Sequence, residues 1–205
     1  MSLGKVGFIG RFKPLHLGAS ALLESLCEKA DEVTIGIGSS NKYNLRNPFT
    51  AEESEKMIDI FLSPRFSNYK IMHVPDFGHV PEYSDGKRWK KEICDAFGKL
   101  DYFVSGNDYV RSLLGDKYRL MCPFDAVPEE KQVRLRATRV RLEMARGEGW
   151  RGLVPTNVAK YLNRDGLVER FRKEFGLQTL ASLAGSESCL HDEDSRQEKM
   201  HVEEA

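Results

Sequence analysis

The order of three segments near the N-terminus constrains the fold of this chain most strongly. They are a short apolar run that ends in glycine, a segment with helical spacing of its apolar residues, and a second short apolar run. The first run, residues 6–10, is typical of a buried strand that enters a turn. Between Leu22 and Ala30 the apolar residues recur at spacings typical of an amphipathic helix. The second apolar run covers residues 33–37 and again leads into glycine. This order predicts a βαβ unit, and therefore a parallel sheet with helices on its faces.

The alternation of strands and helices continues through the first 125 residues. Further helices are expected at 51–62 and 87–97, and further strands at 69–74, 102–105 and 118–122. We therefore predict an α/β fold, with a Rossmann-like, doubly wound, parallel five-stranded sheet over about residues 5–125. Such sheets bind ligands at the carboxyl ends of their strands. The loops after Ile9, Ile37, Val74 and Val104 are thus the expected place for a site.

The last third of the chain has a different pattern. Helical patterns at 140–146, 157–162 and 167–175 predict a small helical cap over about residues 138–176. Residues 1–184 would then form one domain. From 185 to 205 aromatic residues are absent and Ser, Glu, Asp, Gln and His dominate, which predicts a disordered acidic tail.

Composition excludes several classes of function. Lys and Arg number 31, as do Asp and Glu, so no net charge draws the chain to nucleic acid or to an anionic membrane. No apolar run approaches the ~20 residues that span a bilayer, and no signal peptide is recognisable, so we expect a cytoplasmic protein. The four cysteines, Cys27, Cys94, Cys122 and Cys189, form no C-x-x-C pair. We expect reduced thiols and no protein-bound metal.

The first loop, residues 10–19, reads G-R-F-K-P-L-H-L-G-A and runs directly from a strand into a helix. Glycine lets backbone N–H groups approach a phosphate, and a helix N-terminus carries partial positive charge. Arg11, Lys13 and His16 add further donors. The loop lacks the G-K-[ST] of a P-loop and the G-x-G-x-x-G of dinucleotide-binding folds. The sequence therefore predicts a phosphate-binding loop of another kind.

This loop resembles the H-x-G-H motif of the nucleotidyltransferase superfamily. Its G-R-F-x-P-x-H-x-G form is most similar to the archaeal-type nicotinamide-nucleotide adenylyltransferases. The resemblance covers about residues 5–175, because further matches follow in the same order. They are residues 38–40, 46–52, Trp89, 105–107, 137–141 and 150–155.

The resemblance implies transfer of the adenylyl group of ATP to the phosphate of nicotinamide mononucleotide (NMN), which yields NAD and pyrophosphate. Mg²⁺ would be carried mainly by the ATP phosphates, and relatives form homo-oligomers. A phosphate nucleophile is already deprotonated near pH 7, so no general base is required. Catalysis then consists of alignment and of neutralising charge on the triphosphate, for which Mg²⁺, imidazolium, arginine and helix N-termini are suited.

The resemblance also implies roles for individual residues. His16, Arg11 and Arg141 are the candidate catalytic residues. The candidate nucleotide-binding residues lie in the first loop, at the fourth strand and around the late helix: Gly10, Phe12, Lys13, Gly18, Asn107, Thr138 and Arg136. Thr138 is expected to cap that helix, with Arg141 one turn on along the same face.

Three residues are candidates for the NMN side of the site. Arg46 would bind the NMN phosphate, or it is simply a loop cation. Trp89 would stack on nicotinamide, or it anchors a core, and Asp76 is either a ligand contact or a turn former.

Two features depart from the motif. Ala19 stands where the second histidine of H-x-G-H is expected, and a methyl group cannot donate a hydrogen bond. Arg136 and Arg139 replace the serine and the acidic residue usual in relatives, and they either compensate for Ala19 or indicate a more anionic acceptor. Two alternatives therefore stay open: nucleotidyl transfer to another phosphomonoester, or a nucleotide-binding protein with weakened catalysis.

Overall fold

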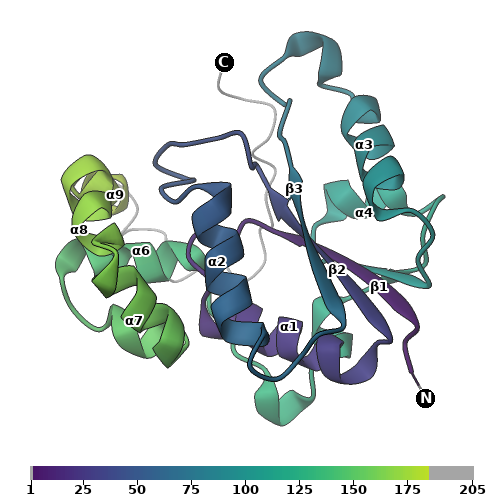
Figure 1. The fold of residues 1–205 in the computed structure, drawn as a ribbon. Coiled ribbons are helices and arrows are strands. Elements are labelled where there is room, and N and C mark those ends of the chain that lie inside the picture. The colour runs from purple at the N-terminus through teal and green to yellow at the C-terminus, as the bar shows by residue number, and fades with distance from the viewer. Residues whose placement is uncertain (1, 185–205) are drawn as a thin grey trace.

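The computed structural model describes residues 2–184 (Figure 1). Residue 1 and residues 185–205, where the sequence predicts an acidic tail, lie outside the described residues. The five strands are β1 (Lys5–Gly10), β2 (Glu32–Gly38), β3 (Tyr69–Val74), β4 (Tyr102–Val104) and β5 (Leu120–Met121). They pair in parallel in the order β3-β2-β1-β4-β5. The predicted parallel five-stranded sheet is confirmed, and its order reverses between β1 and β4, where such sheets bind ligands.

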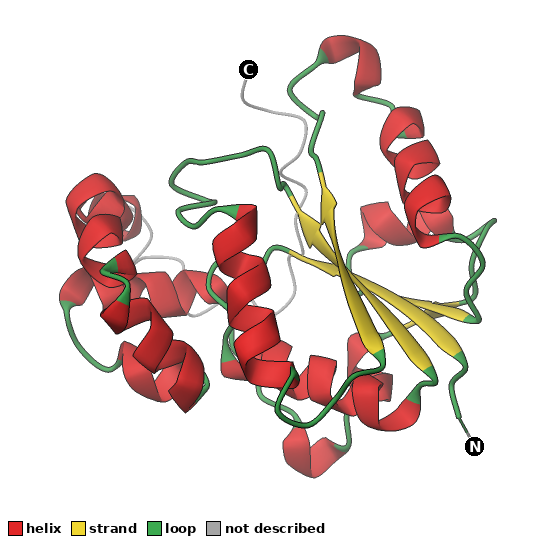
Figure 2. Cartoon of the chain, viewed as in Figure 1, coloured by secondary structure: helices red, strands yellow, loops and turns green. Residues whose placement is uncertain are grey.

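Helices cover both faces of the sheet (Figure 2). The longer ones are α1 (Leu17–Lys29), α2 (Ala51–Leu62), α3 (Lys87–Phe97) and α4 (Asp108–Leu114). The short ones are η1 (Pro81–Tyr83), α5 (Pro123–Ala126) and η2 (Glu129–Lys131). Buried residues of α1 and α2 belong to one core cluster, and those of α3 and α4 to a second. The two clusters thus form the two layers between sheet and helices.

The C-terminal cap consists of helices that lie beside α2 (Figure 1). They are α6 (Ala137–Arg146), η3 (Trp150–Leu153), α7 (Thr156–Arg164), α8 (Leu167–Phe171), the π-helical η4 (Arg172–Gly176) and α9 (Leu177–Ala184). Trp150 is fully buried in the core cluster of α1 and α2, and Phe171 stacks on Phe49 with ring centroids 6.1 Å apart. The cap therefore shares its core with the sheet domain, and its helices continue to residue 184, beyond the predicted end near 176.

Two elements differ from the sequence prediction. The fifth strand was expected over 118–122, but Tyr118 packs in the second core cluster and donates its hydroxyl to the Gly98 carbonyl at 2.9 Å. Pro123, which has no N–H for a strand ladder, then begins α5. Helix α4 was not predicted, because seven residues are too few to show a clear helical period. Within residues 2–184 no helix is both long and apolar enough to cross a membrane.

Candidate active site

The first loop leaves β1 at Gly10 and is held by its own aromatic side chain. Phe12 has a φ of 53°, a left-handed conformation that is uncommon for a residue with a side chain. Its ring covers Gly10 so closely that a Cβ atom there would lie 2.9 Å from the ring. Phe12 is 5% exposed and packs in the core cluster of α1 and α2, so its ring has a structural role in the loop.

Gly18 is required by a second close approach. A Cβ atom at Gly18 would lie 2.6 Å from the carbonyl oxygen of Val133 and 3.3 Å from that of Leu135. The loop that leads into α6 therefore packs directly on the start of α1. This contact gives Gly18 a packing role and brings the N-terminus of α6 next to the first loop.

His16 is the N-cap of α1, and its ring is oriented by that helix. The Nδ1 atom accepts a hydrogen bond from the N–H of Ala19 at 3.3 Å. Neutral His16 therefore carries its proton on Nε2, which leaves that N–H as a donor. Burial, together with the charge of Arg141, lowers the pKa of His16 to about 4. His16 is therefore neutral in the free protein at pH 7.

The lowered pKa of His16 makes the stability of the free protein depend on pH. Between about pH 4 and 6.5 the unfolded chain binds a proton that the folded protein does not, so stability falls as pH falls through this range. We expect the wild type to lose on the order of 1–2 kcal/mol more than His16→Asn between pH 7 and pH 5, in urea unfolding. An equal loss in both proteins would show that His16 does not titrate in this way.

Arg141 connects α6 to the first loop. Its Nη1 donates to the carbonyl of Lys13 at 3.0 Å, and its Nη2 donates to the hydroxyl of Thr138 at 3.3 Å. This second bond confirms that Thr138 and Arg141 share a face of the helix. The prediction that Thr138 caps α6 is wrong, because the N-cap is Arg136 and no side chain caps this end. Lying inside the first turn, the Thr138 hydroxyl accepts from Arg141 instead.

Several cations converge around Arg141. Burial and the charges of Arg11 and Arg46 lower the pKa of Arg141 to about 10. Lys13 is only 1% exposed and donates its Nζ to the carbonyl of Ser39 at 3.2 Å. Burial and Arg11 lower the pKa of Lys13 to about 8, against the opposing charges of Glu52 and Glu53. Burial is the larger cause of both shifts, and repulsion from neighbouring arginines adds to it. A bound polyanion would offset both effects.

Arg11 and Arg46 are the exposed members of this group. Within residues 2–184 neither guanidinium forms a hydrogen bond or an ion pair. The structure therefore brings together Arg11, Lys13, His16, Arg46, Thr138 and Arg141, from three separate segments. Such a set binds and neutralises phosphates.

The other candidates have contacts of their own. Asp76 accepts from the N–H of Gly78 at 2.8 Å and from the hydroxyl of Ser39 at 3.3 Å. Its backbone also pairs with the side chain of Asn41. These contacts favour the turn-forming interpretation of Asp76, which joins the loops after β2 and β3.

Trp89 and Asn107 lie at α3 and α4. Trp89 is half-buried against the second core cluster, which agrees with the core-anchor interpretation and leaves part of the ring exposed. Asn107 follows β4 and caps α4 by accepting from the N–H of Val110 at 3.0 Å. Contacts of either residue with a ligand stay predictions.

Of the two unusual arginines at the start of α6, Arg139 is paired. Its Nη2 lies 2.8 Å from the Oε1 of Glu143, one turn further along the helix. Arg136 is exposed and precedes the first turn of α6. Compensation for Ala19 by either arginine stays a prediction.

Two contributors to the site were missed from the sequence. The carbonyl of Ser39, whose φ is 51°, anchors Lys13, but a backbone acceptor leaves no trace in residue types. Arg170, in helix α8 of the C-terminal cap, binds Glu53 at the start of α2. No local spacing predicts a contact between residues so distant along the chain. Among the described residues, no group of three or more His, Cys, Asp or Glu could hold a metal ion.

Comparison with known proteins defines the class. A family model described as cytidylyltransferase-like matches residues 7–143, and the chain belongs to this family. It is 32% identical over 171 residues to the nicotinamide-nucleotide adenylyltransferase of Pyrococcus furiosus, covering 80% of this chain and 86% of that protein. The enzyme of the same name from Thermococcus kodakarensis is 31% identical over 168 residues, covering 80% and 85%.

A solved structure shows the same fold. It is a bifunctional NMN adenylyltransferase/ADP ribose pyrophosphatase from Francisella tularensis, complexed with AMP and a manganese ion. The match has a TM-score of 0.67 and 17% sequence identity, and it covers 87% of this chain and 54% of that chain. At this identity the comparison supports the fold alone.

Proposed function

We propose that this protein transfers the adenylyl group of ATP to the phosphate of NMN, which forms NAD and pyrophosphate. The observation that carries the proposal is the convergence of Arg11, Lys13, Arg46 and Arg141 around a neutral His16 at the end of β1. The relatives with this reaction in their name match most of the chain.

The chemistry follows from the charges. An oxygen of the NMN phosphate attacks the α-phosphorus of ATP in line, and the bond from that phosphorus to the bridging oxygen of the β-phosphate breaks. Pyrophosphate leaves with the bonding electrons, and no proton transfer to a protein base is needed.

The cations divide between the two substrates. Arg11 and Arg141 would neutralise charge on the triphosphate, and the Nε2–H of His16 would donate to it. Arg46, on the loop after β2, would bind the phosphate of NMN. A bound triphosphate would also favour the charged form of His16, whose pKa is low in the free protein.

The divalent cation would enter with ATP. Among the described residues the site offers cations rather than a cluster of carboxylates, so its chemistry does not fit a resident metal. Mg²⁺ would be bound by the phosphates themselves, as part of the substrate.

Turnover with defined acceptors tests the proposal. The protein is mixed with ATP and Mg²⁺, and pyrophosphate release is followed with NMN, with nicotinic acid mononucleotide or with phosphocholine. We expect release with NMN to be at least tenfold faster than with phosphocholine. Release only with another acceptor would support nucleotidyl transfer to a different phosphomonoester. ATP binding in calorimetry, without turnover of any acceptor, would support a nucleotide-binding protein with weakened catalysis, the alternative that Ala19 favours.

A further inference from the structure

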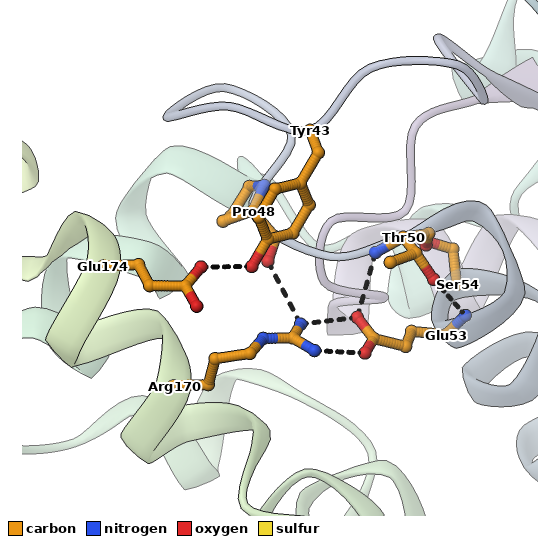
Figure 3. A network of polar contacts seen from close by, with 7 residues as sticks. All are labelled: Tyr43, Pro48, Thr50, Glu53, Ser54, Arg170 and Glu174. Carbon is orange, nitrogen blue, oxygen red and sulfur yellow. Dashed lines mark hydrogen bonds and ion pairs between the residues drawn. The ribbon is translucent and has the colours of Figure 1, made fainter.

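A polar network joins the loop that carries Arg46 to the C-terminal cap (Figure 3). Arg170 of α8 donates Nη1 and Nη2 to the carboxylate oxygens of Glu53, at 2.5 and 2.7 Å. Its Nη2 also donates to the carbonyl of Pro48 at 3.4 Å. One guanidinium thus binds both helix α2 and the end of the preceding loop. Its pair with Glu53 is bidentate, which fixes the orientation of the two side chains.

Glu53 has a second task at the start of α2. Its Oε2 accepts from the N–H of Thr50 at 2.9 Å, and the Thr50 hydroxyl accepts from the N–H of Glu53 at 3.2 Å. This capping box fixes where the loop ends and the helix begins. Because Arg170 binds the same carboxylate, the cap is tied to the point where the chain leaves the loop.

Tyr43 ties the other side of the same loop. Its hydroxyl donates to the carboxylate of Glu174, and its ring meets that of Phe175 edge-on, with centroids 5.4 Å apart. The Arg170 guanidinium lies 5.6 Å from the centre of the Tyr43 ring. Glu174 and Phe175 are consecutive residues of the π-helical η4, and both contact Tyr43.

The segment between these anchors contains Arg46. Tyr43, Asn44 and Arg46 are exposed, so little apolar burial holds this stretch. A short bridge between Asn44 and Asn47 closes it, and the amide of Arg46 donates to the Asn44 side chain at 3.1 Å. Fixing both ends of such a loop lowers the number of conformations that these internal bonds must select against.

We propose that Arg170 is a positioning residue for the acceptor side of the site, which acts by holding the loop so that Arg46 stays near Arg141. Holding Arg46 in place before the substrate arrives lowers the entropic cost of binding its phosphate. The identity of that phosphate as NMN rests on the proposed function, whereas the ordering of the loop does not.

Hydrogen exchange tests the ordering without any substrate. In Arg170→Met, we expect the amides of Asn44, Arg46 and Asn47 to exchange at least tenfold faster than in the wild type, measured by NMR. Arg65→Met is the matched control. Arg65 pairs with Glu24 at 2.7 Å and lies over Phe61 and Phe66, away from this loop. Unchanged exchange in Arg170→Met, or an equal rise in Arg65→Met, would overturn the proposal.

Kinetics then test how Arg170 acts. Arg170→Met should raise KM for NMN about tenfold and leave KM for ATP within twofold, and Arg170→Lys should lie between it and the wild type. In an Arg46→Ala background, Arg170→Met should raise KM for NMN no further. Equal rises for both substrates, or fully additive effects, would overturn the proposal. If the wild type does not turn over NMN, the proposed function fails, and the exchange measurement still decides the role of Arg170.

Discussion

Replacing Arg141 with methionine is expected to lower kcat for adenylyl transfer by about 10³-fold, in the range seen when an arginine that stabilises a transferring phosphoryl group is removed. Arg141 is a buried cation of this group, and it donates to the Lys13 carbonyl and to the Thr138 hydroxyl. Its guanidinium is therefore already oriented before a substrate binds. Steady-state pyrophosphate release at saturating ATP and NMN measures the effect.

Folding and catalysis can be separated for this variant. The lowered pKa of Arg141 shows that its charge is unfavourable in the folded free protein, so removing the charge offsets part of the lost hydrogen bond to Lys13. We expect the free energy of unfolding to change by no more than about 2 kcal/mol. Arg139→Met is the control on the same helix, because Arg139 is paired with Glu143, and its kcat should stay within twofold. An Arg141→Met enzyme with more than a tenth of wild-type kcat would remove Arg141 from the catalytic site.

His16→Asn is expected to lower kcat by about 10²–10³-fold without a comparable loss of stability. In the structure His16 both caps α1 through Nδ1 and presents an Nε2–H donor. Asparagine is a good N-cap, but it is shorter and cannot place a donor where Nε2 lies. The change in kcat reports the loss of the Nε2–H donor, and thermal unfolding reports any loss of the helix N-cap.

His16→Ala completes this comparison. Alanine keeps neither function, so the variant should lose as much kcat as His16→Asn and should also lose about 1 kcal/mol of stability. If His16→Asn kept kcat within threefold of the wild type, the role of His16 would be restricted to capping the helix.

The sheet and most of the first loop could be predicted because the relevant signals are local. Strand 6–10, the glycine turn and the following helix are adjacent in sequence, and parallel strands place their loops at one edge. The same reasoning located Arg11, Lys13 and His16 correctly in one loop. It also placed Arg141 on the same helix face as Thr138.

What could not be predicted depends on tertiary surroundings. His16 is neutral because it is buried close to Arg141, and these two residues lie far apart in the sequence. The ion pair between Arg170 and Glu53 likewise joins segments that are distant in the sequence. The two-residue shift that makes Arg136 rather than Thr138 the N-cap lies within the ordinary uncertainty of helix ends. Such errors fall on the site because the site is built from separate segments.

The most direct test of the central claim is phosphorus NMR of the wild-type protein with ATP, Mg²⁺ and NMN. We predict that the NMN monoester signal is lost while the diphosphate signal of NAD and the signal of pyrophosphate appear in equal amounts. Release of orthophosphate or ADP, or persistence of the NMN signal under conditions where ATP binds, would contradict adenylyl transfer to NMN.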